Sequence, residues 1–379
     1  MPDATIQRPA WAGLRVALVH DWLTGMRGGE KVLESICRLF PDAPLYTLLH
    51  VPGSVSPLIE SRAIHTSLIQ RLPQAVRRYR EYLPLFPVAI EQFDFDHVDL
   101  IISTSHCAAK SVVKTGRAVH LCYCHSPMRY AWDQFDAYFG PERLGRWPSA
   151  LARQVMAWMA RWDRDTAHRV DMYLANSHYV AGRIARYYNR RATVLHPPVD
   201  TDFFTPAGAT PAPDFLVVSA LVPYKRLDVA IDAANRAHAP LVVVGSGPDE
   251  ARLRARAGAT VTFAGSLEGD ALRDRYRRAR AVLLPGEEDF GIVPVEAMAC
   301  GRPVIALGTG GATETVVPGV TGRLVEPGVE AFAAALQEFD DAAFDPAVIR
   351  AHAERFAAAR FESAFAGAVT AALGAGAVC

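Results

Sequence analysis

The sequence predicts an α/β protein built from two doubly wound parallel sheets. Short apolar runs alternate with segments of helical periodicity through both halves of the 379-residue chain, which is the pattern of parallel strands with crossover helices. The length exceeds what one hydrophobic core usually organises. Paired prolines, Pro197 and Pro198, interrupt regular structure between the halves. These observations predict two domains with a boundary at residue 198.

The first half alternates predicted strands with helices. The strands are apolar runs at 14–19, 45–49, 100–103, 119–124 and 172–175, and the helices are expected at 31–40 and 179–188. Since this alternation builds a parallel sheet, we expect one doubly wound sheet in this half.

The second half repeats the alternation. Its predicted strands lie at 215–219, 241–244, 261–263, 281–284 and 304–307, and a helical tail is expected from 345 to 373. Two such sheets facing one another would leave a cleft, and the ligands of open α/β sheets bind outside the carboxyl ends of the strands. The functional residues are therefore expected in the loops that follow strands.

Composition excludes several classes of function. The chain has 40 basic and 40 acidic residues, so it carries no overall field for a polyanion such as nucleic acid. Its six cysteines show no disulfide framework, which suits a reducing compartment. Residues 1–10 lack a signal-peptide core, and no apolar run approaches 18 residues. We expect a cytoplasmic protein that neither spans a membrane nor binds nucleic acid.

The most informative motif is E-E-D-F-G-I-V-P-V-E-A-M-A-C-G at 287–301, which places Glu288 and Glu296 eight positions apart. It follows the strand predicted at 281–284 and opens a helix, whose N-terminus attracts phosphate, while carboxylates accept hydrogen bonds from sugar hydroxyls. Acidic residues and proline are also ordinary in a first helical turn. The glycine-rich run at 308–311 favours the binding interpretation, because glycines permit close backbone approach.

This motif resembles the E-x7-E signature of retaining family 4 glycosyltransferases, which have the GT-B fold. Its form, followed by G-R-P-V-I-A and G-G-A-T-E-T-V, is similar to bacterial O-antigen and exopolysaccharide mannosyltransferases, and the similarity covers about residues 14–365. The resemblance implies two Rossmann-like domains facing an interdomain cleft. Residues 1–198, joined by a last helix at about 360–379 that crosses back, would form the acceptor-side domain, and residues 199–359 would bind the nucleotide-sugar.

The resemblance also implies roles for the motif. Glu288 would accept hydrogen bonds from hydroxyls of the transferred hexose, and Glu296 would contact the nucleotide ribose. The backbone of Phe290, Gly291 and Ile292 would orient the sugar. Retention of configuration would arise by same-face attack, with the departing phosphate taking the acceptor proton, or through a covalent enzyme nucleophile, and both remain open. GT-B enzymes need no metal clamp, so we expect no required metal or other cofactor beyond the nucleotide-sugar donor.

A second motif, S-A-L-V-P-Y-K-R-L-D at 219–228, places Lys225 and Arg226 directly after a predicted strand. Cations at a helix start oppose its dipole, and both side chains suit a diphosphate, although a solvated helix start is the plain alternative. The segment resembles the family motif R-L-x-P-x-K, in which the arginine and lysine hold the diphosphate. Ala220 stands at the arginine position, so Arg226 is expected to replace that contact.

In the first half, H-D-W-L-T-G-M-R-G-G-E at 20–30 is a glycine loop without the G-x-G-x-x-G spacing of nicotinamide-binding proteins. By resemblance, Gly28 and Gly29 approach the donor phosphates and the acceptor.

The run L-C-Y-C-H-S-P-M-R-Y-A-W-D at 121–133 puts His125 at a strand end, where histidines are often structural. The C-Y-C-H segment also suggests a metal site, but buried thiols are ordinary in an apolar strand. Because the family has a functional histidine at this point, His125 is a predicted site residue. The candidates on the acceptor side are Arg129, Asp133 and His106.

Two segments combine arginines with aromatic residues in a way that suits a membrane surface. One set is Arg71, Arg77, Arg78 and Arg80 before the run Y-L-P-L-F at 82–86, and the other is Trp147, Trp158 and Trp162 among Arg146, Arg153, Arg161 and Arg164. A core-packed helix with a solvated arginine face explains the pattern equally well. The lipid-linked acceptor implied by the resemblance favours peripheral contact with the cytoplasmic face of the inner membrane.

We therefore expect a retaining glycosyltransferase that moves mannose from GDP-mannose to a lipid-linked saccharide acceptor in surface-polysaccharide synthesis. The same chemistry with a UDP-hexose stays open, because the backbone near 265–268 does not distinguish guanine from uracil. The alternatives from other classes are a sugar-nucleotide epimerase, a catalytically silent nucleotide-sugar-binding partner, which Ala220 encourages, and a two-domain dehydrogenase.

Overall fold

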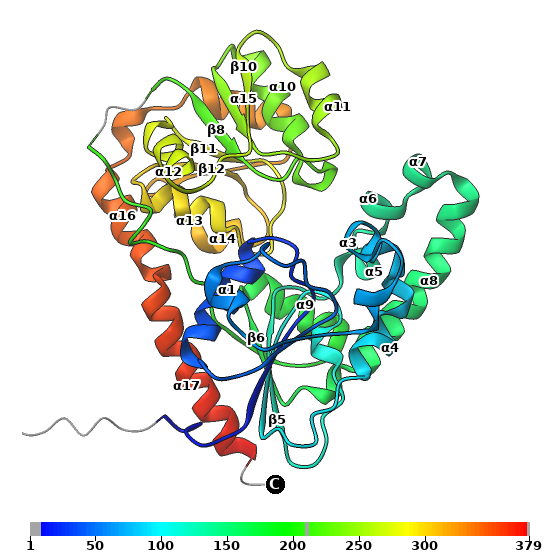
Figure 1. Cartoon of the computed structure of the whole chain (residues 1–379). Helices are drawn as coiled ribbons and strands as arrows, with labels where there is room; N and C mark the ends of the chain where they lie inside the picture. Colours follow the sequence, from blue (N-terminus) through cyan, green and yellow to red (C-terminus); the bar gives the residue numbers. More distant parts are fainter. Residues whose placement is uncertain (1–8, 209–211, 377–379) are drawn as a thin grey trace, which may run out of the picture. The chain divides into compact units, whose positions relative to one another are not determined.

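The computed structural model describes residues 9–208 and 212–376, and the chain divides into two compact units (Figure 1). The first unit extends to Pro198 and takes in the C-terminal segment from Phe361, while the second is Val199–Arg360. Residues 1–8, where no signal-peptide core was found, and Cys379, one of the six cysteines, lie outside the described residues.

The first unit contains a seven-stranded sheet in the order β3-β2-β1-β4-β5-β6-β7, and its paired strands are parallel. The strands are β1 (Val16–His20), β2 (Leu45–Thr47), β3 (Ile64–Thr66), β4 (Leu100–Ser105), β5 (Val119–Cys124), β6 (Met172–Ala175) and β7 (Ala192–Val194). The helices are α1 (Gly28–Leu39), α2 (Pro57–Glu60), α3 (Ala75–Arg78), α4 (Phe86–Glu91), α5 (Arg129–Trp132), α6 (Phe135–Phe139), α7 (Pro141–Leu144), α8 (Arg146–Asp165) and α9 (His178–Tyr188).

The second unit contains a six-stranded parallel sheet in the order β10-β9-β8-β11-β12-β13. Its strands are β8 (Phe215–Val218), β9 (Leu241–Val244), β10 (Val261–Gly265), β11 (Val282–Leu284), β12 (Val304–Leu307) and β13 (Gly322–Val325). Its helices are α10 (Leu227–Ala237), α11 (Glu250–Arg256), α12 (Gly269–Arg278), α13 (Ile292–Ala299), α14 (Ala312–Thr315), α15 (Val329–Gln337) and α16 (Pro346–Ala353).

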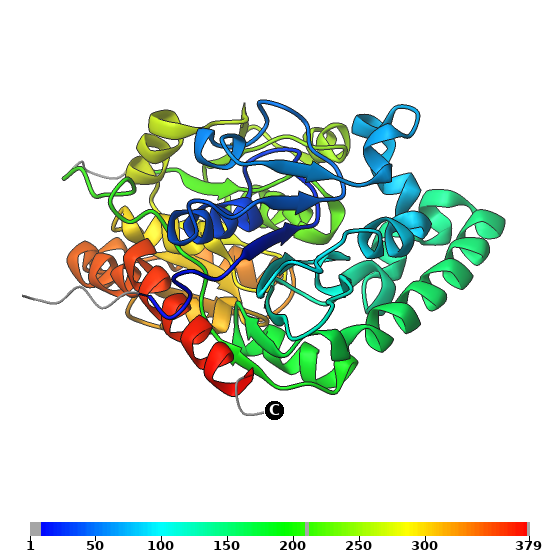
Figure 2. The same ribbon diagram turned by 60° about the horizontal axis from the view of Figure 1, so that its bottom comes forward.

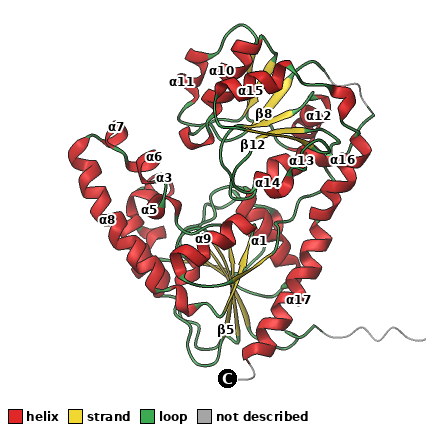
Figure 3. Ribbon diagram, turned by 180° about the vertical axis from the view of Figure 1, so that it is seen from behind, coloured by secondary structure: helices red, strands yellow, loops and turns green. Residues whose placement is uncertain are grey.

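Both sheets are buried on their two faces. Along β1, Ala17 and Val19 belong to one hydrophobic cluster and Leu18 to another, because successive side chains of a strand point to opposite faces. Figure 3 shows helices flanking the strands of each unit. Burial on both faces is typical of parallel sheets and explains why the strands read as continuous apolar runs. The predicted fold class is therefore confirmed.

The strand predictions differ from the structure mainly at the sheet edges. The runs predicted at 119–124, 172–175, 241–244 and 304–307 match β5, β6, β9 and β12 to the residue, whereas the run predicted at 14–19 is Val16–His20. Three strands were missed, and all three, β3, β7 and β13, are edge strands. Edge strands are short and only half covered, so their apolar signal is weak.

The helical tail predicted at 345–373 is wrong as one continuous helix. Extended backbone at Ala357 separates α16 from α17 (Ala358–Gly376). From Phe361 onward α17 belongs to the first unit, where Phe361 packs its ring 5.7 Å from that of Tyr123 and Glu362 pairs with Arg38 at 3.2 Å. Figure 2 shows this last helix in red beside the N-terminal elements in blue.

Candidate active site

In the second unit, the cation and the carboxylate singled out in the sequence meet. Lys225 ends a short 3-10 turn that follows β8, and Glu288 lies in the loop after β11. Because β8 and β11 pair in parallel, their carboxyl ends share one edge of the sheet. The Lys225 Nζ forms an ion pair with Glu288 Oε1, and both side chains are more than four-fifths buried. The sheet thus builds a semi-enclosed ion pair from two distant loops.

Glycines allow these loops to approach one another closely. A Cβ at Gly286 would lie 2.7 Å from the carbonyl oxygen of Lys225, and a Cβ at Gly310 would lie 2.5 Å from that of Glu288. The amide of Gly311 donates to the Glu288 carbonyl at 2.8 Å. Only glycine fits these contacts without moving backbone, so the glycine-rich run at 308–311 supports the loop that carries Glu288.

The helix that follows this loop is α13, and it begins as the sequence motif predicts. Gly291 adopts a φ of 90° as its N-cap residue, and Ile292 is its first residue. Phe290 is buried and its ring centroid lies 5.6 Å from that of Phe356. The backbone from Phe290 to Ile292 is therefore held in place by core packing.

Glu296 lies within α13 and differs in its surroundings from Glu288. Its side chain is buried, and its Oε2 accepts a hydrogen bond from the Tyr276 hydroxyl at 2.9 Å. Burial, together with the Glu296 carboxylate, raises the pKa of Tyr276 well above its usual value. The phenol therefore stays protonated and holds one oxygen of Glu296.

Arg226, which is expected to replace the missing arginine contact, and Ala220, which stands at the family's arginine position, are both at the surface. Arg226 has a φ of 52°, its side chain is mostly exposed, and its Nε contacts Asp228 at 3.3 Å. Ala220 is exposed in the loop after β8. The structure thus pairs Arg226 with a local carboxylate, while Lys225 faces Glu288.

In the first unit, three histidines gather at the carboxyl edge of the sheet. His20 ends β1, His106 follows β4 and His125 follows β5, and these are adjacent strands. The ring centroid of His106 lies 6.4 Å from those of both His20 and His125. Gly29, in the first turn of α1, lies over two of these rings, since a Cβ there would be 3.5 Å from His125 Nε2 and 3.6 Å from His20 Cε1.

Asp21 organises this cluster. Its carboxylate is fully buried and accepts four backbone N–H groups, from residues 106, 107, 108 and 109, at 2.6–3.0 Å. It also pairs with Nδ1 of His106 at 3.0 Å. Burial alone would raise the pKa of Asp21, but the His106 ring holds it well below its usual range. Burial alone would lower the pKa of His106, and the Asp21 charge raises it overall. The Asp21 carboxylate therefore favours the protonated form of the His106 ring.

His125 differs in its protonation. Burial, followed by the neighbouring His106 and His20, lowers the pKa of His125 to about 3. Its carbonyl accepts a bond from Asn176 at 2.9 Å, and its Nε2 is buried without a hydrogen-bond partner among the described residues. A buried polar atom of this kind is uncommon. Burial therefore favours the neutral form of the His125 imidazole.

The remaining predicted residues lie on α1 and α5. Gly28 begins α1, and Arg129 begins α5, from where its charge acts on His106. Asp133 ends α5 and is held by Arg183 at 2.9 Å and by the Tyr187 hydroxyl at 3.2 Å, which ties α5 to α9. These contacts of Asp133 therefore help to hold α5 against α9.

Sequence reasoning missed His20, Asp21 and Glu30. The Nδ1 of His20 forms a hydrogen bond with the Thr104 hydroxyl at 2.6 Å, and its Nε2 lies 3.7 Å from the Glu30 carboxylate. The signal was present, because H-D comes directly after the first strand, at the edge where ligands of parallel sheets bind. Among the described residues, no group of three or more His, Cys, Asp or Glu side chains is arranged to hold a metal ion.

Two family models match the chain. The model described as Glycosyltransferase Family 4 matches residues 26–203, and the model described as Glycosyl transferases group 1 matches residues 199–345. Curated relatives include the D-inositol 3-phosphate glycosyltransferase of Mycolicibacterium smegmatis, 31% identical over 43% of this chain and 44% of that protein. The enzyme of the same name from Mycobacterium tuberculosis is 34% identical over 36% of this chain and 33% of that protein. The chain therefore spans less than half the length of these curated relatives.

Solved structures match nearly the whole chain. Anabaena HepE in complex with UDP-glucose superposes with a TM-score of 0.68 at 20% identity, covering 94% of this chain and 99% of that one. The sucrose-phosphate synthase of Thermosynechococcus elongatus superposes with a TM-score of 0.63 at 20% identity, covering 96% and 98%. These likenesses show the fold, with its two parallel sheets.

Proposed function

We propose that this chain, which the two glycosyltransferase family models match in consecutive segments, is a family 4 glycosyltransferase that transfers a hexose from a nucleotide-sugar donor to an acceptor hydroxyl with retention of configuration. The observation that carries the proposal is the ion pair of Lys225 with Glu288 at the carboxyl ends of β8 and β11. A cation for phosphate and a carboxylate for sugar hydroxyls are the two groups that such a donor requires.

The proposed roles follow from the contacts at this edge. Lys225 binds the diphosphate and stabilises the charge that develops as it leaves, which is the main contribution expected of the protein. Glu288 accepts hydrogen bonds from the hexose. The first turn of α13, with Gly291 and Ile292, offers amide donors to the donor phosphate or sugar. Glu296, whose Oε2 accepts the Tyr276 hydroxyl, is the proposed contact for the nucleotide ribose.

Two donors are proposed. The sequence resemblance favours GDP-mannose, while the likeness to Anabaena HepE, whose structure contains UDP-glucose, favours a UDP-hexose. The acceptor is proposed to be a lipid-linked saccharide, as in surface-polysaccharide synthesis at the cytoplasmic face of a membrane. In the first unit, His125 and Gly29 are the proposed contacts for the reacting end of the acceptor or sugar.

The test is a thermal shift of the purified protein with GDP, GDP-mannose, UDP, UDP-glucose and NAD, since a ligand that binds only the folded state stabilises it by RT ln(1 + [L]/Kd). A GDP-selective shift supports mannose transfer, and a UDP-selective shift supports the UDP-hexose. A shift with NAD alone overturns the proposal. Hydrolysis of the bound donor, measured next, excludes a catalytically silent binding partner.

A further inference from the structure

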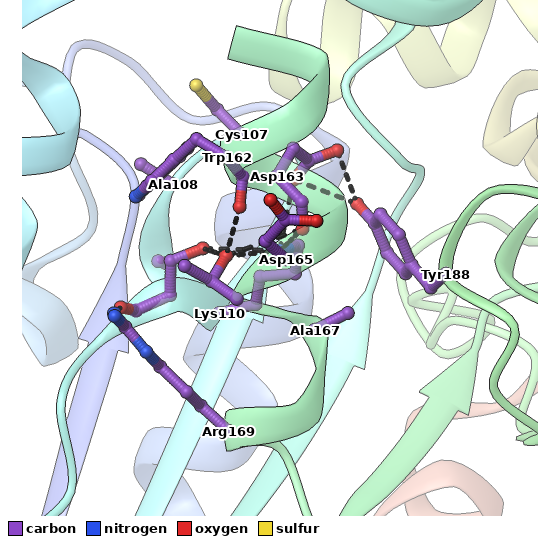
Figure 4. A network of polar contacts seen from close by, with 12 residues as sticks. Cys107, Ala108, Lys110, Trp162, Asp163, Asp165, Ala167, Arg169 and Tyr188 are labelled. Atoms are coloured by element: carbon purple, nitrogen blue, oxygen red, sulfur yellow. Dashed lines mark hydrogen bonds and ion pairs between the residues drawn. The ribbon is translucent and has the colours of Figure 1, made fainter. Parts of the chain in front are cut away.

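The long helix α8 is anchored in the first unit at its C-terminal end. There the buried Lys110 Nζ pairs with Asp163 at 3.0 Å and donates to the Asp163 carbonyl at 2.6 Å. The Asp163 carboxylate also accepts bonds from Trp132 at 2.7 Å and Tyr188 at 2.9 Å. Figure 4 shows the part of this network that joins Lys110, Asp163 and Tyr188. Since removing any partner would leave a buried charge or donor unpaired, this end of α8 is held firmly.

The N-terminal part of the same helix carries apolar side chains into solvent. Trp147 is 87% exposed, Leu151 69% and Trp158 42%, and Leu144 at the end of α7 is also exposed. At about 100° per residue, Leu151 and Trp158 lie within about 40° of Trp147 around the helix. The buried residues Met156 and Met159 lie on another side and join the hydrophobic core. The exposed apolar residues therefore form one face that the first unit does not cover.

Positive charge accompanies this face. Residues 143–162 contain four arginines and no carboxylate. All four arginines, Arg143, Arg146, Arg153 and Arg161, are exposed. Arg153 is also engaged with Asp136 at 2.9 Å and lies over the Phe135 ring at 4.1 Å. The α7–α8 face, consisting of Leu144, Trp147, Leu151 and Trp158 with Arg143, Arg146 and Arg161, is thus apolar and basic.

We propose that the α7–α8 face is a docking surface for an anionic lipid bilayer. Tryptophan is enriched at the membrane interface, where its ring suits the boundary between headgroups and acyl chains. Exposed arginines are attracted to anionic headgroups, and their stems lie along apolar surface while the charge stays in water. A helix with an apolar side and a basic flank lies in the plane of the interface. Among the described residues, no helix is long and apolar enough to cross a membrane, so this contact is peripheral.

The three tryptophans of α8 differ in their exposure, although they stand close together in the sequence. Trp162 is partly buried, and its Nε1 donates to Glu91 at 3.1 Å. It belongs to the anchoring end of α8 and not to the docking surface. The proposal therefore assigns lipid contact to Trp147 and Trp158 and a packing role to Trp162.

The test is co-sedimentation of the whole protein with vesicles of phosphatidylglycerol and phosphatidylcholine, compared with vesicles of phosphatidylcholine alone. The variant Trp147→Ser/Leu151→Ser is expected to lower the partition coefficient for the anionic vesicles by about tenfold or more, because binding scales with buried apolar area. Val348→Ser, on the exposed surface of α16 in the second unit, is the matched control and should bind like the wild type. Circular dichroism confirms that the variants are folded.

A second arm tests the charge. Arg143→Gln/Arg146→Gln/Arg161→Gln should weaken binding to anionic vesicles, as should added salt, whereas Arg236→Gln, an exposed arginine of α10, should not. Equal binding of wild type and both surface variants overturns the proposal. The proposal is also overturned if the wild type binds no vesicles and light scattering shows that it is a dimer which Trp147→Ser/Leu151→Ser converts to monomers. A second copy of the chain would then cover the α7–α8 face. The inference does not rest on the proposed sugar transfer, because no nucleotide or sugar enters the measurement.

Discussion

Lys225 and Glu288 form an ion pair although 63 positions separate them. The pair forms because β8 and β11 are neighbours in the second sheet, so the loops that follow them leave the same edge. Lys225 and Glu288 are therefore each other's partners within the second unit. We expect a bound diphosphate to compete with Glu288 for Lys225, and sugar hydroxyls to take the place of Lys225 on the Glu288 carboxylate.

Lys225→Ala is expected to lower kcat/KM by about 100-fold or more, because it removes the charge opposite the leaving diphosphate. The measurement is initial-rate kinetics with the donor identified by thermal shift. Lys114→Ala, in the first unit, removes a surface lysine that pairs with Asp171 and should leave kcat/KM unchanged. An unaltered kcat/KM in Lys225→Ala would remove this lysine from the mechanism.

Glu288→Gln is expected to lower kcat by about 100-fold while changing the Kd of the free nucleotide less than about threefold, since its proposed partner is the sugar. Calorimetry with the nucleoside diphosphate gives the Kd. The neighbouring exposed Glu287→Gln serves as the control. Equal losses of turnover and of nucleotide affinity would place Glu288 on the nucleotide instead.

Ala220→Arg is expected to tighten binding of the nucleoside diphosphate by about tenfold, because a charge-assisted hydrogen bond to phosphate contributes about 1.5–3 kcal/mol. The residue is exposed, so the longer side chain has room, and Arg226 is already paired with Asp228. Calorimetry compares the variant with the wild type. An unchanged Kd would mean that the phosphate site is already complete.

Asp21→Asn is expected to destabilise the protein by about 3 kcal/mol, because the amide group cannot accept all four backbone N–H bonds and leaves buried donors unpaired. Urea unfolding followed by circular dichroism measures the change. Asp270→Asn, at an exposed position of α12, should change stability by less than about 1 kcal/mol. If Asp21→Asn also lowered the free energy of unfolding by less than about 1 kcal/mol, the loop after β4 would not depend on this carboxylate.

Two buried histidines, His120 and His125, are expected to make the protein less stable as the pH falls below about 6.5. Burial lowers the pKa of His120 to about 4, so between pH 6.5 and 4 the unfolded chain binds a proton that the folded chain does not, and stability falls as pH falls. At pH 5 the loss from His120 amounts to about 2 kcal/mol relative to pH 8. His125, with a pKa of about 3, acts in the same direction. Urea unfolding at the two pH values should show a smaller difference in His120→Gln, and an unchanged difference would contradict this account.

How far the sequence predicted the site depended on whether a signal was local. Lys225 and Glu288 were predicted because each stands in a recognisable motif after a strand. His20 ends β1 and Asp21 follows it, but the contacts of Asp21 are with His106 and the amides of 106–109, which are more than 80 positions away. The acceptor-side role of Asp133 stays a prediction, and the structure adds an ion pair with Arg183 that joins α5 to α9. Residue type alone does not reveal such a tertiary contact.

The amino-acid sequence by itself determined the α/β class, the central strands and the motif that opens α13. These features depend on periodicity, proline and glycine, which act over a few neighbouring residues. Only the tertiary structure decided that Lys225 faces Glu288, that Asp21 organises the loop after β4, and that Trp147 is exposed while Trp162 packs inside. Those outcomes depend on which strands become neighbours and which helix face the core covers, and both result from burial of apolar surface over the whole unit.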